Sequence, residues 1–183
     1  MNVVAYCARS YEGATLGAVG EQANLLVCPP IGGNFIIQHP ESLEGFDVVV
    51  FNLHGWQHHP MWTGDMGMVA LASSALEQMN LSGSGVFAIN CWLGDEHMPM
   101  FKALKKSGVD WIIAGAGVNY AGVDSPVGAD VVLKWFLRYY SKGMEVEKAF
   151  RKAKIAAALL APKANRSQVI ALSDALKFKL WRF

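Results

Sequence analysis

The sequence has little charge and almost no charge imbalance. Only 17% of its 183 residues are charged, and 16 Lys and Arg stand against 15 Asp and Glu, for a formal net charge of +1. A chain without a basic field is poorly suited to bind nucleic acid or an anionic membrane surface, and we expect neither as a partner. Near-zero net charge also gives little protection against self-association, so it favours a homo-oligomer or a partner protein.

Cysteine is also scarce, and its spacing excludes two classes of small protein. Cys7, Cys28 and Cys91 are odd in number, far apart, and form no Cys-x-x-Cys pair. This argues against a disulfide framework and against a zinc ribbon, and it favours a reducing compartment. No basic start followed by an apolar stretch opens the chain, so we predict no secretory signal. We therefore predict a cytoplasmic protein.

Long hydrophobic runs are absent as well. The apolar runs are as long as strands, far below the roughly 20 residues that a helix needs to cross a bilayer. Apolar residues are nevertheless abundant, at 52% of the chain, which argues against intrinsic disorder. A chain of this length can bury one sizeable core and is short for two. We predict a single domain over residues 1–183.

The distribution of the apolar residues predicts an α/β fold. Three runs have the length and β-branching of buried parallel strands, at residues 46–53, 86–91 and 111–116. Apolar spacing of three and four predicts helices at 65–79, 96–106, 127–141 and 145–160, and a short helix or tail follows at 167–183. In the N-terminal third we predict short strands at 3–7, 24–28 and 35–38, with a Gly-rich connection at 13–20. Alternating strands and helices predict an open, mostly parallel sheet flanked by helices on both faces.

Two reactive side chains follow two of the predicted strands. His54 ends the run VVVFNLH and is followed by Gly55, and Cys91 ends the run GVFAINC. Functional groups of open α/β sheets collect at the carboxyl ends of the strands, and neighbouring strands lie about 5 Å apart. A histidine beside a thiol can take its proton, and the thiolate can then attack a carbonyl carbon. The sequence therefore predicts a Cys91/His54 catalytic dyad.

Glycine and a following helix fit the same chemistry. Gly55 and the backbone N–H of Cys91 are candidates for an oxyanion hole, because a residue without a side chain lets N–H groups approach a reacting carbonyl. A helix that begins near Asp95 would point its positive end toward Cys91 and lower the pKa of the thiol.

These segments resemble the caspase-like clan of cysteine peptidases, and the CHAT domains among them most closely. The segments are VVVFNLHG (48–55), VFAINCWLG (86–94) and WIIAGAG (111–117), followed by the paired helices of 129–156. The resemblance covers about residues 46–160. It implies a caspase-like three-layer sandwich, with His54 as general base and Cys91 as nucleophile. It departs from the metacaspase pattern at Asn90 and at the bulky Trp92.

The resemblance also implies where a substrate is held. The primary specificity pocket of the clan lies beside the strand that follows the cysteine, here residues 117–124. It makes Trp92, Asn119, Tyr120 and Asp124 candidate substrate-binding residues. Asp95 and Glu96 are further candidates for an acidic pocket residue.

Each of these residues has a plainer interpretation. Cys91 can be a buried cysteine at the end of a core strand, as we expect Cys7 and Cys28 to be. The histidines 54, 58 and 59 have spacing that suits a metal ion, although Pro60 favours a loop there. The segment 115–122, GAGVNYAG, has a glycine pattern like that of a dinucleotide loop, but its spacing fits a tight turn better.

The leading hypothesis is a cysteine peptidase that hydrolyses peptide bonds through a thioester on Cys91, without a metal or other cofactor. Its partner would be a peptide or protein substrate. The first alternative is a catalytically inactive interaction or scaffold domain, and the second is a metal-dependent hydrolase that uses the histidine cluster.

Overall fold

The computed structural model describes residues 1–160 and 165–183, and a sheet of six strands runs through this part of the chain. The strands lie in the order β2-β1-β3-β6-β7-β8, and every neighbouring pair is parallel except β7 and β8. Their bounds are β1 Val3–Ala8, β2 Asn24–Cys28, β3 Val48–Asn52, β6 Gly85–Ala88, β7 Trp111–Ala114 and β8 Lys179–Arg182. This arrangement confirms the predicted open, mostly parallel α/β sheet.

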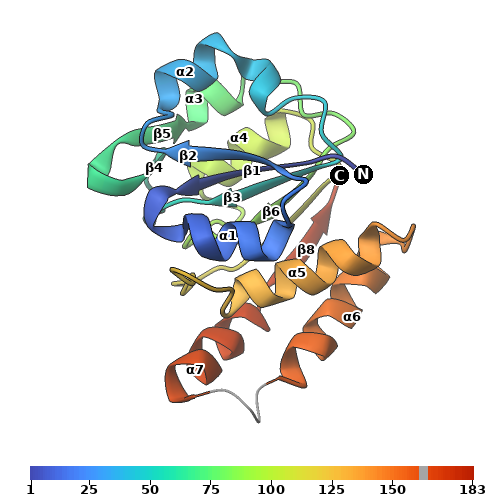
Figure 1. Cartoon of the computed structure of the whole chain (residues 1–183). Helices are drawn as coiled ribbons and strands as arrows, with labels where there is room; N and C mark the ends of the chain where they lie inside the picture. The colour runs from blue at the N-terminus through green and yellow to red at the C-terminus, as the bar shows by residue number, and fades with distance from the viewer. Residues whose placement is uncertain (161–164) are drawn as a thin grey trace.

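Helices cover both faces of the sheet and make it the middle layer of a three-layer sandwich (Figure 1). One face packs against α2, α3 and α4, and the other against α1, α5, α6 and α7. The helices are α1 Glu12–Val19, α2 Gly33–Gln38, α3 Ser73–Leu76, α4 Pro99–Lys106, α5 Ala129–Tyr140, α6 Val146–Ala158 and α7 Arg166–Ala175. Because both faces are covered, β1, β3, β6 and β7 are buried along their whole length, which explains why they are continuous apolar runs.

The order of the strands brings three loops to one edge of the sheet. Strand β3 lies between β1 and β6, with Phe51 opposite Tyr6 on one side and Ala88 on the other. Since all three strands are parallel, the segments that follow them leave from the same edge. Strand β1 also has β2 and β3 on its two sides, so the strand order reverses there, where open α/β sheets commonly bind ligands.

The segment after β3 forms a hairpin instead of the helix predicted at 65–79. Strand β4, Met61–Thr63, pairs antiparallel with β5, Val69–Ala72, and the 3₁₀ turn η3, Asp65–Gly67, joins them. Met66 and Gly67 have φ angles of 57° and 71°, which a continuous α-helix does not allow. The helical prediction was therefore wrong except for α3, because pairing with β4 outweighs the spacing of the apolar residues.

Two predictions for the N-terminal third were also wrong. Residues 35–38 belong to helix α2 and not to a strand, while much of the Gly-rich segment 13–20 forms helix α1. Gly13 and Gly17 give α1 a surface that the loop before α5 approaches closely: a Cβ atom at Gly13 would lie 3.1 Å from the carbonyl oxygen of Val123. These glycines serve close packing and do not break the helix.

The C-terminal segment ends in a strand. Residues 167–183 were predicted as a helix or tail, and they comprise most of α7 followed by β8, which pairs with β7. The aromatic end docks on the body of the protein, because Phe178 is buried and the Trp181 ring packs edge-on against Phe101. Two 3₁₀ turns complete the elements, η1 Arg9–Tyr11 and η2 Pro40–Ser42. In the described ranges, no helix is both long and apolar enough to traverse a bilayer.

Candidate functional site

The segments that follow β1, β3 and β6 enclose a small cavity. Its volume is about 220 Å³, and its lining includes Tyr11, His54, Gly55, Cys91 and Asn119. The two residues proposed as a dyad therefore lie in the wall of one cavity, at the edge that the strand order predicts. No hydrogen bond joins them within the described residues, because each has other partners.

The imidazole of His54 is held from both sides. Its Nε2 atom lies 3.1 Å from Oδ1 of Asp65, and its Nδ1 atom lies 3.2 Å from the hydroxyl of Tyr11. An ionised carboxylate only accepts hydrogen bonds, so Asp65 places the imidazole proton on Nε2. Nδ1 is then the acceptor, and the Tyr11 hydroxyl donates to it. Asp65 thus leaves Nδ1 as the basic nitrogen, the arrangement expected of a general base.

Asp65 reaches His54 because the β4–β5 hairpin folds back over the edge of the sheet. The backbones of His54 and Thr63 exchange two hydrogen bonds, of 2.9 and 3.1 Å, and Asp65 follows two residues later. The backbone N–H and the hydroxyl of Ser10 donate to the Asp65 carboxylate at 2.6 and 2.8 Å. Burial raises the pKa of Asp65, but the hydrogen bonds from His54 and Ser10 outweigh it and hold the pKa below its ordinary value of 3.8. Asp65 is therefore a stable anion beside the imidazole.

Tyr11 connects the histidine to the region of the thiol. Its ring centroid lies 5.1 Å from that of His54, and its side chain lines the same cavity as Cys91. Burial raises the pKa of the Tyr11 hydroxyl, and the negative charge of Asp65 raises it further. The hydroxyl therefore keeps its proton and is available to donate it to Nδ1.

Cys91 is half-buried and contacts the loop that follows β7. Its Sγ atom lies 3.3 Å from the backbone nitrogen of Asn119 and 3.5 Å from the carbonyl oxygen of that residue. The Asn119 side chain donates to the carbonyl of Asn90, and the backbone N–H of Trp92 donates to the carbonyl of Gly117. The backbone N–H of Asn119 can stabilise a thiolate, because hydrogen bonds to a charged group favour the charged form.

Backbone strain and unpaired polar atoms collect around this thiol. Trp92 has a φ angle of 65°, a region that bulky residues rarely adopt. Two buried polar side-chain atoms of the described chain lack a hydrogen-bond partner, Nδ2 of Asn90 and Oγ1 of Thr63. Asn90 precedes Cys91, and Thr63 pairs with His54 through the backbone. Unsatisfied groups and strain are typical of functional sites, where other demands override stability.

Gly55 lets the segments after β3 and β6 meet. A Cβ atom at this position would lie 2.7 Å from the carbonyl oxygen of Cys91, closer than such atoms approach in proteins. In the ranges that the structure describes, no protein acceptor pairs with the backbone N–H of Gly55 or of Cys91. These two N–H groups are therefore available to donate hydrogen bonds to a substrate oxyanion, as an oxyanion hole requires.

The prediction that a helix N-terminus points toward Cys91 is wrong. Helix α4 begins at Pro99, and the residues between Cys91 and Met98 form turns instead of the first turn of a helix. The effect of a helix terminus falls off within its first turn. A positive helix end therefore does not account for the reactivity predicted for Cys91.

The predicted substrate-binding residues divide into two groups. Asn119 lines the cavity, and Trp92 is half-buried beside Cys91 in the sequence. Tyr120 is 53% exposed and lines a neighbouring cavity, while Asp124 is exposed and lies over Gly13 of α1. Asp95 accepts a hydrogen bond from the backbone of His97, and Glu96 accepts one from Trp181, so both acids are engaged outside this cavity.

A buried carboxylate supports the loop that carries Asn119. Asp130, at the start of α5, accepts hydrogen bonds from the backbone N–H groups of Gly122 and Val127 at 2.8 and 3.3 Å. Asn52, the last residue of β3, donates to Asp130 and to the hydroxyl of Thr15. Burial raises the pKa of Asp130 to about 7, although the two backbone hydrogen bonds oppose the shift. Asp130 therefore ties strand β3 to the loop against Cys91.

Sequence reasoning missed Tyr11, Asp65 and Asp130 as parts of this site. Tyr11 and Asp65 lie in 3₁₀ turns that only the tertiary fold brings to His54. Asp130 carried the one available signal, an acidic residue among the apolar positions of a predicted helix. A carboxyl at such a position needs hydrogen-bond partners once it is buried.

The remaining histidines and cysteines lie outside the cavity wall. His59 contacts the carbonyl oxygen of Met61, and the backbone N–H of His58 points to the sulfur of Met98. The described residues bring no three His, Cys, Asp or Glu side chains together as metal ligands would be. Cys7 is buried, which raises the pKa of its thiol to about 12, and Cys28 is buried too.

Comparisons with known proteins correct the family resemblance. No family model matches the chain, and no curated protein sequence matches it. A structural match is a flavodoxin of Streptococcus pneumoniae TIGR4, at 13% sequence identity and a TM-score of 0.39, over 78% of this chain and 99% of that one. The resemblance to the caspase-like clan and to CHAT domains is therefore wrong. Its signature, a strand that ends in a reactive residue, is a general property of open α/β sheets.

Proposed function

We propose that the chain is a cysteine-dependent hydrolase that cleaves peptide bonds, with Cys91 as nucleophile and His54 as general acid and base. The observation that carries the proposal is the shared cavity, whose wall contains both Cys91 and an imidazole oriented by Asp65. Nucleophile, base and orienting carboxylate are the three parts that activate a weak nucleophile. The proposal rests on this geometry and no longer on a family.

The first half of the reaction forms a thioester. The Cys91 proton moves to Nδ1 of His54, whose present partner, the Tyr11 hydroxyl, lines the same cavity as the thiol. The thiolate then adds to the carbonyl carbon of the substrate, and the N–H groups of Gly55 and Cys91 stabilise the oxyanion. The C–N bond breaks as the imidazolium gives its proton to the leaving amine, which leaves the acyl group on sulfur.

The second half consumes one water molecule. Neutral His54 takes a proton from the water, the hydroxide adds to the thioester carbon, and the C–S bond breaks. The imidazolium returns the proton to the Cys91 sulfur, and the products are a carboxylic acid and the amine released earlier. Asp65 stays ionised throughout and stabilises the imidazolium in both halves.

The chemistry also bears on partners and compartment. A free thiol is required, and all three cysteines of the described chain are unpaired, which supports a reducing compartment such as the cytoplasm. The expected partner is a peptide or protein substrate. The near-neutral charge of the chain favours self-association or a partner protein.

Hydrolysis of an unfolded, dye-labelled casein tests the proposal. We expect the wild-type protein to release the dye at neutral pH, and both Cys91→Ala and His54→Ala to lose this activity. Cys28→Ala is the matched control, because this thiol also ends a strand but is buried away from the cavity, and it should retain activity. Absence of wild-type hydrolysis, or full activity in Cys91→Ala, contradicts the proposal.

A non-catalytic binding domain is the second candidate, and one observation favours it. Both ring nitrogens of His54 and the sulfur of Cys91 already have protein partners. In a domain of this kind the contacts would serve stability alone. His54→Ala would then lower the free energy of unfolding without changing the rate at which iodoacetamide alkylates Cys91.

A further inference from the structure

Two further cavities lie next to the one that Cys91 and His54 line. The first has a volume of about 320 Å³, and Ala121 lines both it and the Cys91 cavity. The second, of about 220 Å³, shares Val127 and Gln168 with the first. The shared residues place the three cavities side by side, from the cavity that Cys91 lines to the space between α5, α6 and α7. We call the two outer cavities together the apolar groove.

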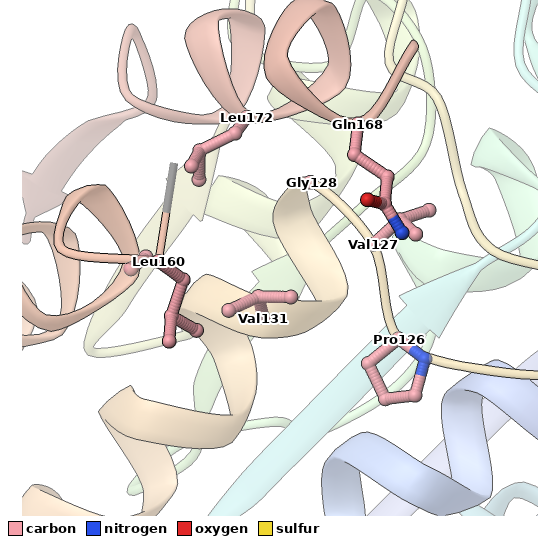
Figure 2. A pocket seen from close by; sticks show the side chains of 8 residues that line it. Pro126, Val127, Gly128, Val131, Leu160, Gln168 and Leu172 are labelled. Atoms are coloured by element: carbon pink, nitrogen blue, oxygen red, sulfur yellow. The ribbon is translucent and has the colours of Figure 1, made fainter. Parts of the chain in front are cut away.

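The walls of the two outer cavities carry no charged residue within the described chain. Tyr120 and Ile170 border the first and are 53% and 50% exposed. Figure 2 shows Val131, Leu160 and Leu172 around the second, with Gln168 at its rim. Exposed apolar side chains that line a cavity are typical of a binding site, whereas single apolar residues on a flat surface commonly have no function.

The groove has rigid supports on both sides. Asp130 accepts two backbone hydrogen bonds from the loop that supplies Ala121 and Val127. On the other side, Asn165 and Gln168 form a capping box that fixes the first turn of α7. Gly128 lies so close to α7 that a Cβ atom there would be 2.9 Å from the carbonyl oxygen of Ala171. The groove is therefore built by packed elements on each wall.

We infer that the apolar groove holds the acyl half of a peptide substrate and selects bulky apolar side chains next to the scissile carbonyl. This inference rests on the proposed function and names its substrate class. The acyl half stays attached to Cys91 as the thioester, so cavities that adjoin the Cys91 cavity are placed to contact it in both halves of the reaction. Burial of a leucine-like side chain against apolar, uncharged walls favours binding. Burial of a charged side chain there is unfavourable, because the charge loses its hydration.

Two chloromethyl ketones that differ only in their side chains test the assignment. We expect acetyl-Leu-Leu chloromethyl ketone to alkylate Cys91 about tenfold faster or more than acetyl-Gly-Gly chloromethyl ketone, as followed by intact-protein mass. Ile170→Asp places a charge in the groove and should bring this ratio close to one. Val169→Asp is the matched control, since Val169 is 42% exposed on the same helix and lines neither outer cavity.

Iodoacetamide separates a failure of the groove from a failure of the proposed function. It has no side chain to fill the groove, so its rate with Cys91 should be equal in the wild type, Ile170→Asp and Val169→Asp. If that rate depends on His54 while the Leu/Gly ratio is near one, the groove assignment is wrong and the proposed function stands. If Cys91 alkylation does not depend on His54, both proposals fail.

Discussion

Two cysteines lie at the carboxyl ends of parallel strands of the same sheet, Cys28 as the last residue of β2 and Cys91 three residues after β6, and their surroundings differ. Cys28 closes β2 beneath the β4–β5 hairpin, and a Cβ atom at Gly64 of that hairpin would collide with it. Burial raises the pKa of the Cys28 thiol. Cys91 follows β6, is half-buried, and lies in a cavity wall with His54. A thiol at a strand end is therefore a candidate nucleophile only where the following segment leaves it open to a base.

The hairpin accounts for both environments. Through Gly64 it packs against Cys28, and through Asp65, the next residue, it orients His54 in the cavity that Cys91 also lines. One unpaired polar atom and one strained residue flank the Cys91 thiol, Nδ2 of Asn90 and the backbone of Trp92. The difference between the two strand ends thus reflects tertiary contacts and not the strands themselves.

The largest expected effect comes from Asp130, which supports the loop at the Cys91 end. Because its pKa is raised from 3.8 to about 7, the folded protein keeps a proton that the unfolded chain releases in that window. The free energy of unfolding should therefore fall by up to about 4 kcal/mol as the pH rises from about 4 to about 7. Above about pH 7 the titration of Asp130 should cause no further change. Urea unfolding at a series of pH values measures it.

Two variants isolate the contribution of this carboxyl. The difference in the free energy of unfolding between the wild type and Asp130→Asn should change across the same pH window and become constant above it. Asp124→Asn, an exposed carboxyl of the same loop, should follow the wild-type profile. If the free energies of unfolding of the wild type and Asp130→Asn differ by a constant amount from about pH 4 to about pH 8, Asp130 does not have the raised pKa.

Asp65 is expected to have the next largest effect. Asp65→Asn replaces the carboxylate that fixes the proton on Nε2, so His54 loses its orientation and the support for its imidazolium form. We expect the rate of casein hydrolysis to fall about 100-fold, while the alkylation of denatured protein stays unchanged. Asp95→Asn removes an acid outside the cavity and should retain the wild-type rate. A hydrolysis rate within twofold of wild type in Asp65→Asn contradicts a role for this carboxylate.

The smallest of the three effects concerns the close approach at Gly55. Gly55→Ala places a methyl group against the carbonyl oxygen of Cys91 and should cost about 1–3 kcal/mol of stability, with the Cys91 end displaced from His54. Gly117→Ala is the matched control, because no atom lies within 4 Å of its added Cβ and we expect a change below about 0.5 kcal/mol. Thermal unfolding gives both values. Equal stability in the two variants contradicts the tight packing.

The central sheet could be predicted because buried parallel strands are continuous apolar runs bounded by turn residues. Residues 46–53 and 111–116 contain β3 and β7, and their order along the chain implies parallel pairing. The hairpin could not be predicted, because the apolar spacing of 65–79 fits a helix equally well. Only pairing with Met61–Thr63 decides between the two.

The candidate site was predictable only where it depends on strand ends. His54 and Cys91 lie two and three residues after the ends of β3 and β6, so the rule for carboxyl ends finds both. Tyr11 and Asp65 reach the imidazole from turns whose positions depend on packing, and no local spacing predicts that contact. The family resemblance failed for a related reason: short strand-end signatures recur in unrelated sheets, so they locate reactive residues without identifying a family.

The reactivity of Cys91 relative to Cys28 in the same molecule tests the account most directly. The measurement is the rate of alkylation by iodoacetamide at neutral pH, resolved for each cysteine by peptide mapping, in the wild type and in His54→Ala. We predict that Cys91 reacts at least about 100-fold faster than Cys28 and that His54→Ala removes most of this advantage. Equal rates for the two thiols, or a Cys91 rate that His54→Ala leaves unchanged, would contradict it.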